Sequence, residues 1–359
     1  MPKTFLLFLL FSALHSHASP TESERIKRGY ELAAETWGQK WQIATDPSEK
    51  KKLLENRPDP SASATELWRQ FAPSLKEDWT IPYSTFFLGL TRNLSMADPD
   101  GNTRTAFTEE RKRIFETFAK NHTAKPDIAP FCIAIADNGD TKSLHILEKI
   151  IAENPDEAIK GIAAFAAAML LKTLGDAPEV MKKRLTYLRQ AIIMAADQTV
   201  GEINIADIVT NELYVIRFLS KGRNAPDLSG TDVGGRIIRL SEMRGKTVIL
   251  LFWDATSAET DKFIGLTNAM AMKYSDKPVV IIGVTPEALD RIRELQAKEA
   301  IKWNNIIDSE DKLAKEYRIA VRPAAFVISP EGKFEYIGLP GSFMEMTMDA
   351  LLAGDVPPQ

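Results

Sequence analysis

Residues 248–260 read VILLFWDATSAET, and this stretch decides the fold of the C-terminal part of the chain. Its six consecutive apolar residues end at Phe252 and Trp253, which is typical of a strand buried on both faces, as in the centre of a parallel sheet. The polar residues that follow favour a helix start, because Thr256 and Glu259 form a capping-box pattern. We therefore predict a buried strand that runs directly into a helix N-terminus.

This strand, turn and helix resemble the active-site segment of the thioredoxin-like fold, in its TlpA/ResA-type and AhpC/TSA redoxin branch. There a strand ends Phe-Trp-Ala-x-Trp-Cys-x-x-Cys. Setting Phe252 and Trp253 on that Phe-Trp places Ser257 and Thr260 where the two cysteines belong. The Cys-x-x-Cys motif is thus replaced by SAET at residues 257–260, and both active-site thiols are absent.

Further motifs extend the resemblance over residues 222–354. Residues 224–228 (NAPDL) are similar to the family's entry motif, and residues 240–246 (LSEMRGK) to the segment before the central strand. Residues 317–333 (YRIAVRPAAFVISPEGK) are similar to the cis-proline strand and its hairpin. The resemblance implies a central mixed β-sheet flanked by helices, with a cis peptide bond between Arg322 and Pro323.

The preceding region, residues 22–220, shows helical periodicity with almost no strand pattern, and no convincing repeat. We predict an irregular helical bundle or short solenoid, with a helix pair at 141–153 and 155–174. The apolar run 163–171 is expected at its centre. The tryptophans of this region either pack in the core or line a ligand groove; they are Trp37, Trp41, Trp68 and Trp79.

A polar segment with glycine and proline at 220–226 marks the predicted boundary between the helical domain and the thioredoxin-like domain. Beyond it, strand patterns alternate with helical ones, which indicates an α/β domain. The expected strands are 236–240, 247–253, 279–284, 324–328 and 334–337. A turn at 329–332 (SPEG) joins the last two, with proline at its second position and glycine at its fourth.

Length and charge limit the classes of protein to which the chain could belong. The chain has 359 residues, 44% hydrophobic, which is enough for two domains. Its 45 basic and 49 acidic residues give a net charge of -4 without long runs of either sign, so nothing indicates nucleic acid as a partner. Residues 1–18 resemble a secretory signal, with Lys3, an apolar core and small residues up to Ala18. We expect an exported protein, periplasmic or extracellular, soluble after cleavage and without a membrane anchor.

Few residues remain for thiol, metal or serine chemistry. After cleavage the chain keeps His122, His145 and the single Cys132, which sits in an apolar run and is expected to be buried. No set of these residues has metal-ligand spacing, so we predict neither a metal nor a cofactor. Serine hydrolysis at Ser257 would need a base beside it, and both histidines lie in the helical region. Thr256 or Ser257 is then interpreted as a helix cap.

The candidate ligand-binding residues are Trp253, Asp254, Ser257, Arg322 and Pro323. The resemblance implies that a peptide is held against the backbone before the cis-proline, and we expect Asp254 and Arg322 to pair there. The leading hypothesis is a redox-inactive thioredoxin-like protein that binds an envelope protein or peptide. One alternative is a thiol-disulfide oxidoreductase or antioxidant redoxin that uses a partner's cysteines, and another is a transferase for a thiol cofactor. Whether the protein is an enzyme stays open.

Overall fold

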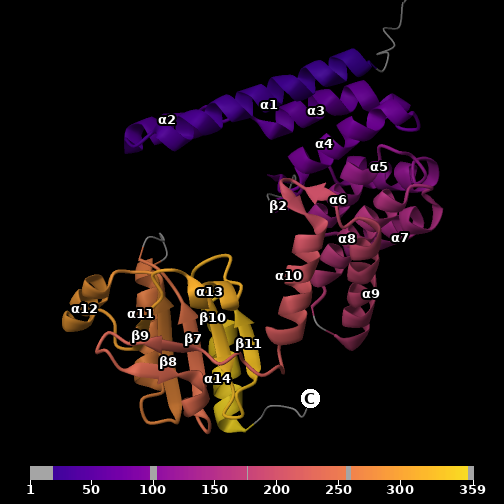
Figure 1. Ribbon diagram of the computed structural model, residues 1–359. Helices are drawn as coiled ribbons and strands as arrows, with labels where there is room; N and C mark the ends of the chain where they lie inside the picture. The colour runs from indigo at the N-terminus through magenta and orange to yellow at the C-terminus, as the bar shows by residue number, and fades with distance from the viewer. Residues whose placement is uncertain (1–18, 98–102, 176, 256–259, 355–359) are drawn as a thin grey trace, which may run out of the picture. The chain divides into compact units, whose positions relative to one another are not determined.

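The structure, a computed structural model, divides the chain into two compact units, residues 1–210 and 211–359 (Figure 1). It describes residues 19–97, 103–175, 177–255 and 260–354. The predicted signal at 1–18 and the predicted caps Thr256 and Ser257 lie outside these residues. Within the described part of the chain, no helix has the length and apolar character of a membrane span.

Helices make up most of the N-terminal unit, as predicted. Proline and a capping side chain begin the first of them: α1 (Pro20–Ile43) is capped by Ser19, α2 (Pro47–Glu55) by Asp46 and α3 (Pro60–Phe71) by Asp59. The helices that follow are α4 (Ile81–Thr91), α5 (Thr108–Asn121), α6 (Ala129–Asn138), α7 (Leu144–Glu153), α8 (Glu157–Lys172), α9 (Pro178–Met194) and α10 (Ile205–Phe218). Short 3-10 turns at Ala72–Ser74, Asp78–Thr80 and Thr141–Ser143 precede or join some of them.

The structure corrects two sequence-based expectations in this unit. Two small antiparallel hairpins interrupt the helices, β1 (Ser95–Ala97) with β2 (Thr103–Thr105) and β3 (Thr199–Val200) with β4 (Ile203–Asn204). Their strands are too short to give an alternating pattern. In addition, α8 begins after Pro155, because Asp156 accepts hydrogen bonds from the first free backbone N–H groups of the helix.

The centre of the N-terminal unit is α8, as its apolar composition predicted. Almost every residue from Ile159 to Leu171 is buried. Gly161 is the point of closest approach: a Cβ added there would lie 2.5 Å from the Cβ of Ala195 and 2.8 Å from its backbone nitrogen. Only glycine therefore allows α8 to lie this close to the end of α9.

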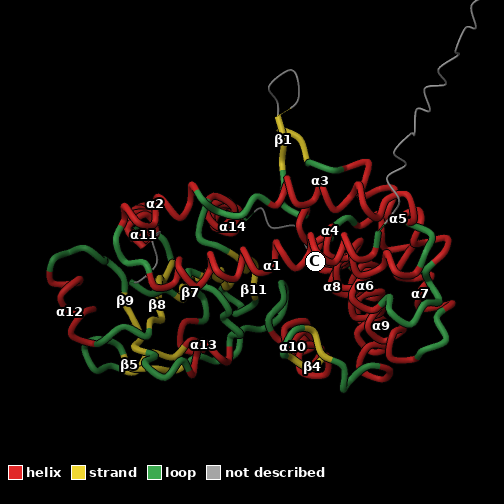
Figure 2. Tube along the Cα trace, turned by 90° about the horizontal axis from the view of Figure 1, so that it is seen from above, coloured by secondary structure: helices red, strands yellow, loops and turns green. Residues whose placement is uncertain are grey.

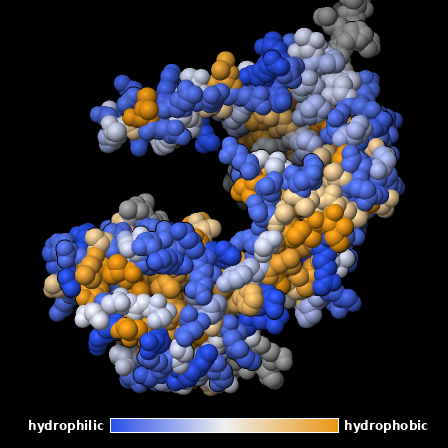
Figure 3. All heavy atoms as spheres, viewed as in Figure 1, coloured by the Kyte–Doolittle hydropathy of each residue, from blue (hydrophilic) through white to orange (hydrophobic). Residues whose placement is uncertain are grey.

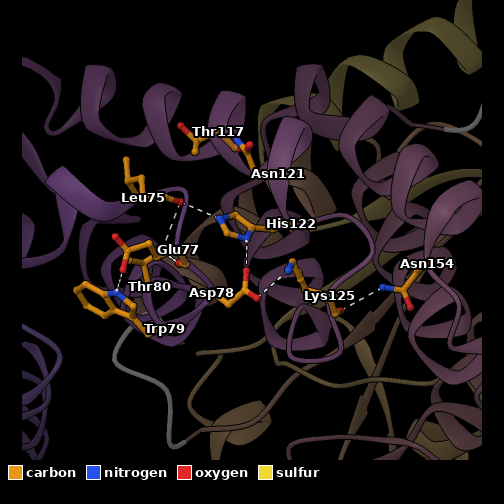
Figure 4. Close-up of polar contacts among 10 residues, drawn as sticks. All are labelled: Leu75, Glu77, Asp78, Trp79, Thr80, Thr117, Asn121, His122, Lys125 and Asn154. Carbon is orange, nitrogen blue, oxygen red and sulfur yellow. Dashed lines mark hydrogen bonds and ion pairs between the residues drawn. The ribbon is translucent and has the colours of Figure 1, made fainter.

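A buried histidine joins the end of α5 to the segment before α4 (Figure 4). His122 is fully buried, and its Nε2 donates to the carbonyl of Leu75 at 2.7 Å. Its Nδ1 lies 3.4 Å from Asp78, whose other oxygen accepts from Lys125 at 2.7 Å. The role of His122 is thus to connect two segments far apart in the chain.

The four tryptophans of the N-terminal unit are half-buried and make three separate sets of aromatic contacts, with Trp79 against Tyr83. Trp37 and Trp41 stack on each other on α1, with ring centroids 5.4 Å apart, and Trp68 packs against Phe71 and Phe87. Around the first pair, α1 and α2 present mostly polar surface with isolated apolar residues (Figure 3).

The C-terminal unit is built on a five-stranded mixed sheet in the order β11-β10-β7-β8-β9. Its strands are β7 (Thr247–Phe252), β8 (Val279–Thr285), β9 (Asn304–Ile307), β10 (Ala324–Ile328) and β11 (Phe334–Gly338). The central strand β7 runs parallel to β8 and antiparallel to β10, and all of its residues are buried. The predicted central strand and the mixed sheet are confirmed.

Helices cover both faces of this sheet (Figure 2). On one face α11 (Thr260–Lys273), α12 (Leu289–Ala297) and α14 (Ser342–Ala353) pack through Phe263, Met270, Ile292, Met344 and Met348. On the other face lie α13 (Lys312–Glu316) and a small hairpin of β5 (Ser229–Thr231) and β6 (Ile237–Arg239). The SPEG turn is confirmed, with the Gly332 amide donating to the Ser329 carbonyl at 2.8 Å and Gly332 at φ 82°.

The boundary between the units lies earlier than the predicted segment at 220–226. It falls between residues 210 and 211, inside α10. The reason is that Tyr214, Val215 and Leu219 pack against the sheet core of the C-terminal unit. A polar, glycine-containing segment can therefore lie within a unit when the helix before it supplies apolar contacts.

Candidate functional site

The candidate site lies where the central strand β7 ends. Ala324, the first residue of β10, pairs with Phe252, the last residue of β7. This register brings Arg322 and Pro323 beside Trp253 and Asp254. The peptide bond between Arg322 and Pro323 is cis, which confirms the prediction made from the motif.

Trp253 belongs to the core, so its assignment as a ligand-binding residue is wrong. The side chain is fully buried, between Phe263 and Trp303, with ring centroids 5.7 and 6.0 Å away. Its indole Nε1 donates to Asn305 Oδ1 at 2.9 Å, so the polar atom is already satisfied. The apolar run thus extends one residue beyond β7, and Trp253 packs in the core. The accessible part of the site begins at Asp254.

Two side chains hold the backbone that leaves β7. Glu287, which follows β8, accepts a hydrogen bond from the Ala255 amide at 2.8 Å. Thr260, at the start of α11, donates its hydroxyl to the carbonyl of Asp254 at 3.1 Å. Thr260 thus has a structural role at one cysteine position of the motif, and Ser257, at the other, lies outside the described residues.

The predicted ion pair between Asp254 and Arg322 is wrong. The guanidinium of Arg322 pairs with Asp311, the residue just before α13. Asp311 adopts a left-handed backbone conformation with φ 54°, next to the loop that leads to the cis-proline. Arg322 Nε is buried and has no hydrogen-bond partner within the described part of the chain. The arginine therefore closes the cis-proline loop onto the start of α13.

An apolar pocket lies beside Pro323. Its volume is ≈ 290 Å³, and it is lined by Pro323, by Val321 and Leu339, and by Val215 and Leu219 from the end of α10. Val321 and Leu339 are 70% and 66% exposed, so the rim offers apolar surface to solvent. This arrangement suits an apolar side chain of a peptide better than a charged small molecule.

Comparison with known proteins agrees with this architecture. Residues 221–337 match the sequence model of the AhpC/TSA family. This part of the chain is similar to TlpA/ResA-type redoxins. The thiol-disulfide oxidoreductase ResA of Bacillus anthracis is 29% identical over 159 residues, which cover 43% of this chain and 87% of that protein. ResA of Geobacillus kaustophilus (strain HTA426) is 25% identical over 157 residues, covering 44% of this chain and 88% of that protein.

Among solved structures, a thiol:disulfide interchange protein from Bacteroides sp. shares 26% sequence identity and has a TM-score of 0.34. The match covers 38% of this chain and 91% of that one.

Sequence reasoning missed Glu287, Asn305 and Asp311. One signal was available for Glu287: it follows a predicted strand next to β7, and the carboxyl ends of parallel strands meet at one edge of a sheet. Asn305 gave no signal because β9 itself was missed. Its sequence, Asn-Asn-Ile-Ile, is too short and too polar at its start to be predicted as a strand.

Proposed function

We propose that this protein is an exported thioredoxin-like protein that binds a protein or peptide at the cis-proline end of its sheet, without exchanging disulfides itself. The observation that carries the proposal is the position of the chain's single cysteine, Cys132. Disulfide exchange requires an accessible thiolate, and the two family positions hold serine and threonine.

Cys132 is unsuited to substitute for the missing thiols. It lies on α6 in the N-terminal unit and is fully buried, with its thiol 3.6 Å from the carbonyl of Ile128. Burial raises the pKa of Cys132 to about 12, so the thiol stays protonated at neutral pH. The family's chemistry therefore has no nucleophile in this chain, while the fold and the pocket beside Pro323 remain.

The first experiment tests for disulfide exchange. The purified protein should reduce insulin with dithiothreitol no faster than a buffer control. The double variant Ser257→Cys, Thr260→Cys is expected to gain activity, because it returns thiols to a helix start next to the cis-proline. Turnover well above the control that persists in a Cys132→Ala variant would contradict the proposal and favour exchange through a partner's cysteines.

A second experiment tests binding. Reduced, carboxymethylated α-lactalbumin is a suitable probe, since it presents extended apolar segments and no thiols. Leu339→Ser should weaken its binding roughly tenfold, because covering the exposed Leu339 side chain with the probe would contribute about 1.5 kcal/mol. Met272→Ser is the matched control: Met272 is also 66% exposed but lies on α11, away from the pocket lining. Equal binding by both variants would contradict a site at Pro323.

A further inference from the structure

A second pocket lies in the N-terminal unit, far in sequence from the redoxin motifs. Its volume is ≈ 630 Å³, within the range of small-molecule sites. One wall is the first part of α5, and the other is the turn between α6 and α7 with the start of α7. Phe115 and Ile146 provide apolar lining.

The rim of this pocket carries three cationic side chains, Arg111, Lys112 and Lys142. Arg111 is half-buried, and within the part of the chain that the structure describes its guanidinium has no hydrogen bond or ion pair. Burial lowers the pKa of Arg111, and the charge of Asp140 acts in the opposite direction. A guanidinium has five donors in a fixed planar arrangement, and those of Arg111 face solvent at the pocket, where a ligand can reach them.

Two carboxylates also line the pocket, Asp140 and Glu116. Asp140 accepts a hydrogen bond from the Lys142 amide at 3.0 Å, so one of its oxygens is used within the turn. Glu116 lies one helical turn from Lys112 on α5. The three cations of the lining outnumber its two carboxylates, and Arg111 is the cation that offers a planar set of donors.

We propose that this pocket binds a small carboxylic acid with an apolar body. The planar guanidinium of Arg111 matches a carboxylate in a bidentate pair, and Lys112 and Lys142 add positive charge at the rim. Phe115 and Ile146 receive the apolar part of the ligand. This site is independent of the proposed peptide binding in the other unit.

The test uses 3-phenylpropionate as the probe. Its binding to the full chain is measured by ligand-detected NMR and by calorimetry. Binding is expected with a Kd on the order of 1 mM, the range of a small fragment. Arg111→Gln should weaken it roughly ten- to a hundredfold, the loss of a charge-assisted hydrogen-bonded pair. Lys142→Gln is a second variant, with an expected loss of a few fold through one rim charge.

Arg69→Gln is the matched control, since Arg69 is exposed on α3 and outside the pocket lining. It should leave binding unchanged. The neutral isostere 3-phenylpropanol should bind much more weakly, and inorganic phosphate likewise. The proposal is overturned if the alcohol or phosphate binds as well as the acid, if Arg111→Gln and Arg69→Gln behave alike, or if no binding is seen.

Discussion

The hydrogen bond between Trp253 and Asn305 offers a direct test of how the sheet supports the site. Asn305 is fully buried on the edge strand β9. Its Oδ1 accepts from Trp253 at 2.9 Å, and its Nδ2 donates to the Trp303 carbonyl at 3.0 Å. The substitution Asn305→Ala removes both bonds while leaving the backbone pairing of β8 and β9 in place.

The cost follows from burial. The indole N–H of Trp253 would lose its acceptor in a dry environment, and an unsatisfied buried donor costs about 1–3 kcal/mol. The neighbouring donor Trp303 Nε1 already has no acceptor within the described residues, so the indole of Trp253 would find no replacement acceptor there. We expect a local destabilisation of about 2 kcal/mol, which is roughly a thirtyfold increase in the opening of β7 and β9.

Hydrogen exchange by mass spectrometry measures this opening segment by segment, which suits a chain of two units. Peptides from β7 and β9 should lose roughly thirtyfold in protection, while helices of the N-terminal unit keep theirs. Asn304→Ala is the control, because Asn304 is exposed and precedes Asn305 on the same strand. A loss below about twofold, or an equal loss in the control, would refute the reasoning.

Three further predictions concern other parts of the chain. Gly161→Ala should destabilise the N-terminal unit by about 1–3 kcal/mol, because the added methyl group clashes with Ala195. Gly38→Ala, in open space on α1, should be neutral or stabilising by up to about 1 kcal/mol. Chemical denaturation of both variants tests this difference, and equal effects would contradict it. The pKa of Asp349 is lowered by its hydrogen bonds, first with Lys273 and then with Tyr274. The carboxylate therefore adds to the free energy of unfolding above its pKa in the unfolded chain, and this stabilisation is lost as pH falls through its pKa in the folded protein. Because these groups are largely exposed, Asp349→Asn should lower the free energy of unfolding by only about 0–1 kcal/mol at about pH 6, and by less near pH 2. A stability difference between the two proteins that grows in acid would contradict this. Finally, N-terminal sequencing of protein from the cell envelope should begin at Ser19, and an intact Met1 terminus found only in the cytoplasm would reject export.

Local sequence determined much of the fold. The apolar run 248–253 dictated a buried central strand, and a proline with a capping side chain began the first helices at Pro20, Pro47 and Pro60. The cis bond before Pro323 followed from a motif. These features depend on backbone preferences and on periodicity within one segment, so they can be recognised without knowing the rest of the structure.

Tertiary structure alone decided which side chains meet. Arg322 was expected to reach Asp254 across the sheet, yet it pairs with Asp311. Trp253 was counted among the candidate ligand-binding residues, yet its indole N–H donates to an asparagine on an unrecognised strand in the core. Register places backbones beside each other, but the direction of a long side chain depends on packing from distant segments. The sequence by itself therefore determined the thioredoxin-like scaffold, and the three-dimensional packing determined the partners within the site.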